Sequence, residues 1–476
     1  MTSHDRYTSP LSERYASGAM LALWSPATRY GLWRRLWLAL AEAEQALGVA
    51  IPDAAIAQMR DHLDDIDFDA VAAYERRYRH DVMAHVHAFG DAAPAARKFI
   101  HLGATSAYVT DNTDLILMRR GLDLLRGKLV TVLRSLGEFA RRWRDVPTLG
   151  STHLQAAQPT TVGKRATLWM QDLVLDVAEL DHRRGTLPCR GVKGTTGTQA
   201  SFLELFGGDH ERVRELDRRV TAAIGFAASI PVSGQTYTRK LDAAVLDVVA
   251  GIAASAAKFS GDLRVLQAHG EIEEPFEEEQ IGSSAMAYKR NPMRSERIAS
   301  LARFVLSLEP NANQTHSVQF FERTLDDSAN RRLAIPESFL AADAILVIME
   351  NVVSGLEVHP ARIARRLADE LPFMATEALI IRAVQAGMDR QEAHEHIRKA
   401  SIAAARALKD GAATNDMLDR LAADPAWPVP APEMRSLLDP LAFTGRARSQ
   451  VGEFLAEVVE PLLAGAAAAE REEVRV

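Results

Sequence analysis

The 476-residue sequence is poor in several features that would assign it to particular classes of protein. Its single cysteine, Cys189, cannot form an internal disulfide or a cysteine-based zinc cluster, and we expect a chain from a reducing compartment. Acidic residues outnumber basic ones, and the resulting net charge of -7 argues against a nucleic-acid partner. Any anionic small molecule must therefore be met by Lys and Arg side chains that gather locally.

Long apolar runs and targeting signals are scarce as well. The most apolar stretch, residues 243–257, contains Asp247, and we predict that it is too short and too polar to span a membrane. The opening string MTSHDRYTSPLSERY lacks the apolar core of a signal peptide, so we expect a cytoplasmic protein. The glycines of GVKGTTGTQASF, residues 191–202, fit neither a dinucleotide-binding pattern nor a P-loop.

Helical periodicity, in contrast, is abundant. Apolar residues recur at alternating steps of three and four over residues 115–143 and 245–266, and a third helix is predicted from about residue 326 to 353. Helices of about thirty residues are roughly 45 Å long, and three of them predict an all-α fold around a central helical bundle. Apolar stripes of this length are hard to cover within one subunit, so we also predict an oligomer.

Shorter elements flank the predicted bundle. We expect one helix over residues 33–47, another from about residue 69 to 89, and a break at Leu371-Pro372 among the later helices. The three histidines of the second helix do not share one face, so we expect no metal site there. The pattern predicts three domains: residues 1–105, 106–358 and 359–476.

The donor-rich segment, residues 282–297, reads GSSAMAYKRNPMRSER. It holds two serines and four cations: Ser283, Ser284, Lys289, Arg290, Arg294 and Arg297. The Gly-Ser-Ser opening and Asn291-Pro292 predict a loop over the whole segment. Such a density of donors is typical of a site for something anionic, although a solvated surface loop has the same composition.

This segment resembles the signature loop GSSxMPxKxNP of the fumarase/aspartase superfamily, and its YKR with the following MRSER is similar to the adenylosuccinate lyases within it. Ala287 stands where relatives usually have proline, so we expect a more flexible loop. The resemblance extends over almost the whole chain through the strings SPLSERYAS, RHDVMAHVH, HLGATS, KGTTGTQASF, GQTYTRK, LPFMATE and DPLAFTGRA.

The resemblance carries several expectations about fold and function. It implies an all-α, three-domain subunit of the fumarase/aspartase type, in a homotetramer whose sites draw residues from three subunits. It implies no metal and no organic cofactor. Members of the family release fumarate from adenylosuccinate, giving AMP, and from SAICAR, giving AICAR.

Elimination of fumarate needs a base, an acid, and donors facing the carboxylate on which charge builds. The resemblance implies that Ser283 is the base, that Lys289 supplies positive charge, and that His153, in GSTHLQAAQP, is the general acid. It also implies that Glu296 positions the catalytic histidine. Serine is a poor base unless cations or backbone donors stabilise its alkoxide, and the residues alone leave Ser284 as a competitor.

Substrate contacts would come from segments far apart in the sequence. The resemblance implies that Thr105 and Ser106 hold the succinyl carboxylate, although capping a helix is their ordinary role. Arg323, Ser328 and Arg332 suit a phosphate, the last two being one helical turn apart. The remaining candidates are Arg14, Tyr15, Arg79, His80, Asp81, Gln235 and Arg297, with His80 also a catalytic candidate and His101 near the site.

Two alternatives remain at this point. Another lyase of the superfamily, such as argininosuccinate lyase, would share the signature loop but should lack the phosphate-suited set of Arg323, Ser328 and Arg332. A non-catalytic helical scaffold would keep the apolar seams. It would have no reason to retain a histidine, a serine and a lysine of the lyase pattern together.

Overall fold

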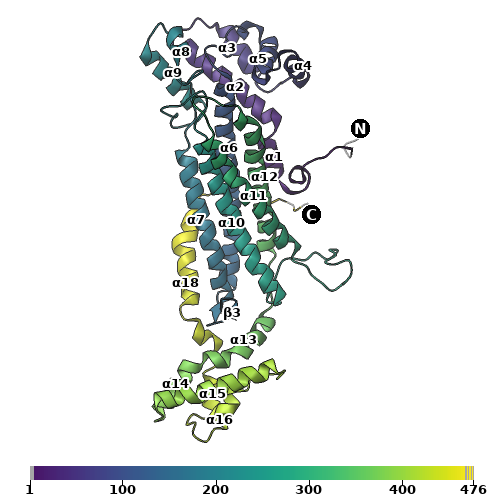
Figure 1. Ribbon diagram of the computed structural model, residues 1–476, viewed down its shortest axis with the longest axis vertical. Coiled ribbons are helices and arrows are strands. Elements are labelled where there is room, and N and C mark those ends of the chain that lie inside the picture. Colours follow the sequence, from purple (N-terminus) through teal and green to yellow (C-terminus); the bar gives the residue numbers. More distant parts are fainter. Residues whose placement is uncertain (1–4, 467–468, 470, 473, 475–476) are drawn as a thin grey trace.

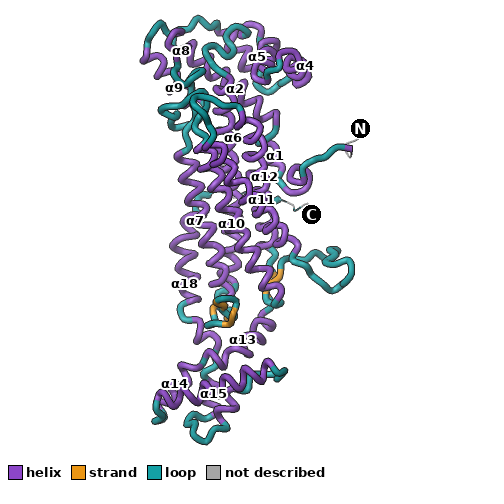
Figure 2. The backbone as a smooth tube through the Cα atoms, in the orientation of Figure 1, coloured by secondary structure: helices purple, strands orange, loops and turns teal. Residues whose placement is uncertain are grey.

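The computed structural model describes residues 5–466, 469, 471–472 and 474, and its described part is dominated by helices (Figure 2). Five long helices run side by side as a bundle (Figure 1): α6 (Ser106–Arg142), α7 (Val162–Thr186), α10 (Lys240–Ala268), α11 (Met293–Ser317) and α12 (Asp326–Ser354). The longest of them, α6, has 37 residues and is therefore roughly 55 Å long. The bundle forms the long middle part of the molecule, and shorter helices extend beyond both of its ends (Figure 1).

Three of these helices confirm the predicted seams, whereas α7 and α11 are bundle members that the periodicity did not reveal. The reason lies in how much of each helix is buried. In α6, 25 of 37 residues are buried, but α7 buries nine of 25 and α11 seven of 25. A narrow apolar stripe interrupted by charges gives a weak periodic signal.

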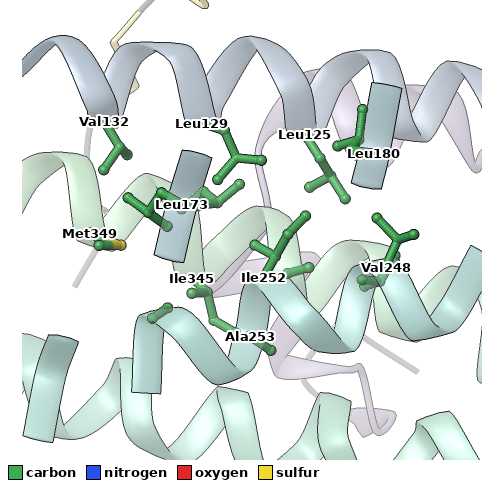
Figure 3. Close-up of a cluster of buried hydrophobic side chains, with 14 of the residues drawn as sticks. Leu125, Leu129, Val132, Leu173, Leu180, Val248, Ile252, Ala253, Ile345 and Met349 are labelled. Atoms are coloured by element: carbon green, nitrogen blue, oxygen red, sulfur yellow. The ribbon is translucent and has the colours of Figure 1, made fainter. Parts of the chain in front are cut away.

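The bundle core is built from apolar side chains of all its helices. Figure 3 shows side chains converging from α6, α7, α10 and α12, among them Leu125, Leu129, Val132, Leu173, Leu180, Val248, Ile252, Ile345 and Met349. The prediction that the apolar stretch in α10 is too short and too polar to span a membrane is wrong, because by length and composition this helix of 29 residues could cross one. It packs against α7, α11 and α12, as a core helix of a globular protein does.

Short helices cover the end of the bundle drawn at the top of Figure 1, called the upper end below. They are α2 (Pro26–Ala46), α3 (Asp53–Asp61), α4 (Phe68–Tyr78), α5 (Asp81–Ala92), η3 (Pro94–Ala96), α8 (Ala200–Leu205) and α9 (His210–Ala223). The N-terminal η2 (Leu11–Tyr15) and α1 (Gly18–Leu23) lie along the flank of the bundle, against α12. The single helix predicted over residues 69–89 is wrong: it is split into α4 and α5. Arg79 between them adopts a left-handed conformation with φ of 53°, and His80 caps α5.

The opposite, lower end carries the other short helices. They are α13 (Pro360–Met374), α14 (Thr376–Gln385), α15 (Arg390–Lys409), α16 (Met417–Ala422), α17 (Ala431–Ser436) and η4 (Pro440–Thr444). The last elements, α18 (Ala447–Phe454), η5 (Leu455–Val459) and α19 (Glu460–Leu463), return along the flank of the bundle, where α18 packs against α7. The predicted break at Leu371-Pro372 is wrong, because α13 continues to Met374. Pro372 lies in the last turn of α13, so the amide hydrogen that it lacks costs the helix only one backbone hydrogen bond close to its end. The domain boundaries at residues 105 and 358 stay a prediction.

Three antiparallel pairs of two-residue strands complete the described structure. They are β1 (Pro147–Thr148) with β4 (Thr160–Thr161), β2 (Ser151–Thr152) with β3 (Gln155–Ala156), and β5 (Ile272–Glu273) with β6 (Glu357–Val358). The β2–β3 hairpin lies near the lower end of the bundle. Between β5 and α11 the chain forms a side loop, residues 274–292, which protrudes from the flank of the bundle (Figure 1).

Candidate active site

The first group of predicted site residues is brought together by the starts of α5, α6 and α12. His80 accepts a hydrogen bond from the Met83 amide at Nδ1, 3.3 Å away, and its Nε2 lies 3.5 Å from Ser106 Oγ. Asp81 accepts a hydrogen bond of 2.9 Å from Arg332 Nη2. His80, Asp81, Ser106 and Arg332 therefore form one partly exposed cluster, although they lie up to 252 positions apart in the sequence.

Three more candidates flank this cluster. Thr105 is the N-cap residue of α6, but its side chain makes no capping hydrogen bond, so ordinary capping does not account for its hydroxyl. Arg79 is exposed in the turn before His80. His101 accepts a hydrogen bond of 2.9 Å from Trp37 Nε1, and burial lowers the pKa of its imidazole to about 4, so that His101 is neutral at neutral pH.

Gln235 and the phosphate candidates lie on two loops that touch. The Gln235 amide donates a hydrogen bond of 2.9 Å to the carbonyl of Glu322, in the loop between α11 and α12. In the same loop, Arg323 donates to Asp327, 3.0 Å away. Ser328 lies in the first turn of α12 and Arg332 one turn later, which confirms their predicted spacing in a helix.

A network of buried ion pairs underlies these loops, and the sequence analysis did not find it. Arg239 pairs with Asp111 at 3.2 Å and with Asp327 at 2.7 Å. Arg331 pairs with Asp114 at 2.9 Å and with Asp242 at 2.7 Å. The sequence did contain a signal, because Asp111 and Asp114 interrupt the apolar start of α6, and buried carboxylates require partners.

The charges of this network compensate one another. Burial alone would raise the pKa of Asp114, but the Arg29 and Arg331 guanidinium groups outweigh it and hold that pKa below its ordinary value. Burial would lower the pKa of Arg331, but Asp242, Tyr237 and Asp114 raise it well above its ordinary value. The Asp114 carboxylate and the Arg331 guanidinium are therefore both charged at neutral pH.

The side loop carries Ser283 and Lys289. Ser283 Oγ accepts hydrogen bonds from two backbone amides, those of Ala285 at 3.3 Å and Met286 at 3.2 Å. Ser284 is exposed, and its side chain makes no hydrogen bond among the described residues. Two donors directed at one hydroxyl oxygen therefore distinguish the first serine from the second.

The side loop closes on itself. Asn291 Nδ2 donates a hydrogen bond of 2.6 Å to the Gly282 carbonyl. A Cβ atom on Gly282 would lie 2.0 Å from the Lys289 carbonyl oxygen, so this position requires glycine. Lys289 is exposed on the loop. The hydrogen bonds and ion pairs from the loop to the rest of the chain come from its two ends, whereas the part with Ser283 and Lys289 is bonded to the loop itself.

The prediction of a loop through residue 297 is wrong at its end, because α11 begins at Met293 and includes Arg294 and Arg297. The carboxylate of Glu274 accepts the backbone amides of Arg294 and Ser295, both at 2.9 Å. Free amides at a helix start need such acceptors, and a carboxylate outside the helix supplies them here.

Arg297 lies against the N-terminal segment. Its guanidinium is 5.5 Å from the centre of the Tyr15 ring, a distance typical of a cation–π contact. Arg14 is exposed beside Tyr15. Glu296 is exposed in the first turn of α11, 3.9 Å from Arg264, and its predicted pairing with the catalytic histidine stays a prediction.

His153 occupies a strained position. It forms, with Leu154, the two-residue turn between β2 and β3, and both residues are left-handed, with φ of 52° and 57°. Asn and Gly normally fill such turns, so a histidine and a leucine there store backbone strain, which is typical of functional positions. His153 is exposed at this turn. A hairpin, and not a helix start, positions His153, because α7 begins only at Val162.

Acidic groups also gather at the base of the side loop. Ligand atoms of Glu273, Glu357 and His359 lie within 4.8 Å of one another. The Arg290 guanidinium lies 3.5 Å from Glu273 and 3.3 Å from Glu357, so a cation already pairs with both carboxylates.

The predicted site residues of one chain thus form separate groups. Those of α5, α6 and α12 lie at the upper end, the β2–β3 hairpin lies near the lower end, and the side loop protrudes from the flank (Figure 1). Within the described residues, no hydrogen bond or ion pair joins His153, Ser283 and the upper-end cluster. A bundle built on a helix roughly 55 Å long keeps these groups apart.

Comparisons with known proteins find lyases that resemble this chain over nearly its whole length. Residues 23–306 match the family model described as Lyase, and residues 372–454 match the one described as Adenylosuccinate lyase C-terminus. The chain is 51% identical over 466 residues to the adenylosuccinate lyase of Saccharomyces cerevisiae, covering 97% of each chain. It is 50% identical to that of Schizosaccharomyces pombe, covering 98% of this chain and 97% of the relative.

Solved structures agree on the fold. A 3-carboxy-cis,cis-muconate lactonizing enzyme from Pseudomonas putida matches with a TM-score of 0.82 at 24% identity, covering 94% of this chain and 98% of that one. A fumarate lyase from Mesorhizobium sp. BNC1 matches with a TM-score of 0.79 at 24% identity, covering 95% and 99%. These likenesses confirm the all-α fold of the fumarase/aspartase type, and the full-length matches show that the chain belongs to the adenylosuccinate lyase family.

Proposed function

We propose that this chain releases fumarate from adenylosuccinate, giving AMP, and from SAICAR, giving AICAR. The observation that carries the proposal is the 51% identity to an adenylosuccinate lyase over 97% of both chains. The match of residues 372–454 to the adenylosuccinate lyase C-terminus supports the same specificity within the superfamily. We also propose that the protein is located in the cytoplasm.

Ser283 is the proposed base. Its alkoxide takes a proton from the carbon next to a succinyl carboxylate, and the electrons of that C–H bond form the double bond of fumarate as the C–N bond breaks. The two backbone amides that donate to Ser283 Oγ support this role, because they would stabilise negative charge on that oxygen. Lys289, on the same loop, would add positive charge when the loop lies over the substrate.

His153 is the proposed acid. An imidazolium there would give its proton to the departing nitrogen, so that the products leave as neutral amine and fumarate. Its exposure and its left-handed backbone support a functional rather than a packing role. Glu296 would hold this imidazole in the assembled site.

The upper end would bind the remainder of the substrate. Thr105 and Ser106 offer hydroxyl donors for the succinyl carboxylate, with His80 beside Ser106. Arg323, Ser328 and Arg332 offer guanidinium and hydroxyl donors for the phosphate. The other proposed contacts are Arg14, Tyr15, Arg79, Asp81, Gln235 and Arg297.

We further propose a homotetramer in which each site takes residues from three chains. The separation of the groups along the bundle supports this assembly, since one chain does not bring them together. Large apolar side chains exposed on the bundle helices support it as well: Leu168, Leu175, Val265, Phe304 and Leu306. Large apolar side chains that are exposed on long packed helices are typical of subunit interfaces.

The test is to incubate the purified protein with adenylosuccinate, SAICAR and argininosuccinate, and to follow ultraviolet absorbance and fumarate release. We expect turnover of the two purine substrates only. Ser283→Ala and His153→Ala should each lower kcat by about 100- to 10,000-fold. Ser284→Ala is the matched control and should retain activity.

The assembly is tested with the same variants. In shared sites, mixing inactive Ser283→Ala and His153→Ala proteins creates some sites with both wild-type residues, so activity should return. Sedimentation should give a tetramer. Inactive mixtures, or turnover of argininosuccinate alone, would contradict the assembly and the specificity, respectively.

A further inference from the structure

Two loops that carry proposed substrate residues are joined by one side chain. Gln319, in the loop between α11 and α12, donates from Nε2 to Thr236 Oγ1 at 3.1 Å and to the Tyr237 carbonyl at 2.9 Å. Its Oε1 accepts the Arg239 amide at 2.9 Å. The loop clasp, defined as Gln319 with Thr236, Tyr237 and Arg239, thus satisfies both ends of one amide group with three partners on the segment that follows Gln235.

The backbone of Gln235 is held on both sides next to this clasp. Its amide donates to the Glu322 carbonyl at 2.9 Å, and its carbonyl accepts from Arg190 Nε at 2.7 Å. Arg190 is fully buried, and its other guanidinium nitrogens donate to the carbonyls of Gly191 and Gly194. The main chain of Gln235 therefore has a defined position in which only the side chain is left to adjust.

The two loops also approach too closely for other residues. A Cβ on Gly234 would lie 2.6 Å from the Glu322 carbonyl oxygen and 2.7 Å from Glu322 Cα. Close contact of two main chains fixes their separation, while the clasp fixes their register along each other. A small slip between the loops would move Gln235 relative to Arg323 and Ser328, which share the second loop and the start of α12.

We propose that Gln319 is a positioning residue that sets the side chain of Gln235 against the phosphate-binding residues of the α11–α12 loop. Gln319 itself does not touch the substrate and acts through Gln235. This inference rests on the proposed function, because it assigns Gln235 to substrate binding. It predicts that Gln319 matters for activity only while Gln235 is present.

The test is a double-mutant cycle on adenylosuccinate turnover by the full-length protein. Gln319→Met keeps the length of the side chain but removes all three hydrogen bonds, and we expect a KM about 10-fold higher with kcat changed less than about 3-fold. In the Gln235→Ala background, the same substitution should change KM by less than about 2-fold, because the group that it positions is gone. Gln314→Ala, an exposed glutamine on α11, is the matched control.

Thermal unfolding accompanies each variant, because a purely structural role would lower the unfolding temperature without changing KM. Thr236→Val removes one contact of the clasp and should raise KM in the same direction by a smaller factor, which keeps the test valid if Gln319→Met unfolds. The inference would be overturned if Gln319→Met left KM unchanged, or if it raised KM by the same factor with and without Gln235. Turnover by the wild-type protein would leave the proposed function intact in either case. Wild-type protein without turnover would overturn the proposed function and the inference with it.

Discussion

The upper end of the bundle and the side loop hold their polar residues in opposite ways. At the upper end, Arg239 and Arg331 are buried and paired with four carboxylates. In the side loop, Ser283 bonds only to the loop's own backbone, and Lys289 is exposed. One chain therefore carries a braced region, which holds proposed substrate contacts, and a locally folded loop, which holds the proposed base.

This difference separates two tasks of the proposed reaction. Groups that bind a phosphate and a carboxylate have to be placed accurately before the substrate arrives, and a buried network does this. A loop that carries a base has to let the substrate in and then exclude water, which few contacts with the bundle permit. Variants that affect stability and activity differently in the two regions test the comparison.

The largest effect on stability is expected at the centre of the braced region. Asp327→Ala removes the partner of Arg239 and of Arg323, and a buried guanidinium left with fewer carboxylates is costly. We expect a loss of about 3–5 kcal/mol in the free energy of unfolding. Urea unfolding measures it.

Ser284→Ala in the side loop is the matched comparison. An exposed hydroxyl without a partner among the described residues should contribute less than about 0.5 kcal/mol. Equal losses in the two variants would show that the regions do not differ in the way proposed here.

A smaller effect is expected from a carboxylate that the upper end leaves unpaired. Glu44 on α2 is fully buried, neither of its carboxylate oxygens has a hydrogen-bond partner in the described part of the chain, and burial raises its pKa to about 8. The unfolded chain ionises this group near pH 4.5, whereas the folded chain keeps the proton. Its contribution to stability is therefore complete below about pH 4.5 and is lost as the pH rises to about 8.

Glu44→Gln removes this titration. Between pH 5 and pH 8, the free energy of unfolding of the variant should rise by about 2–3 kcal/mol relative to that of the wild type. The upper limit is set by the pKa shift, each unit of which corresponds to roughly 1.4 kcal/mol. Urea midpoints at four pH values in that range give the result. If the urea midpoints of the two proteins changed with pH in the same way, the Glu44 carboxyl would have to have a hydrogen-bond partner in solution.

The sequence predicted much of the fold and less of the geometry of the site. The seams of α6, α10 and α12 could be recognised because their apolar residues recur over many turns. The helices α7 and α11 could not, since they bury few residues. The split between α4 and α5 depends on one left-handed residue, Arg79, which no periodicity signals.

For the site, resemblance to a family named individual residues, but residue patterns alone did not place them. The strain at His153 arises from a two-residue hairpin turn. The hydrogen bonds from the Ala285 and Met286 amides to Ser283 Oγ arise from a local turn of the backbone, which only the three-dimensional structure shows. The ion pairs of Arg239 join α6, α10 and α12 across more than eighty positions. Such pairings depend on the tertiary fold, and single-sequence patterns do not encode them.

The smallest effect on stability is expected at the base of the side loop, and this effect should depend on salt. The Arg290 side chain is 45% exposed and pairs with Glu273 and Glu357 over 3.5 and 3.3 Å. Exposed pairs contribute about 0–1 kcal/mol, and salt screens them. Arg290→Gln should therefore cost about 0.5 kcal/mol in the free energy of unfolding at 0.05 M NaCl and close to nothing at 1 M.

Urea unfolding at both salt concentrations, with Asp327→Ala alongside, makes the contrast direct. The deficit of Asp327→Ala should persist at 1 M NaCl, because its partner Arg239 is buried and salt screens a buried pair much less. A salt-independent loss above about 2 kcal/mol in Arg290→Gln would mean that the base of the loop is anchored as firmly as the upper end. In that case weak anchoring at the base of the loop could not explain its proposed opening. Only the tip around Ser283 would then move when the loop closes over the substrate.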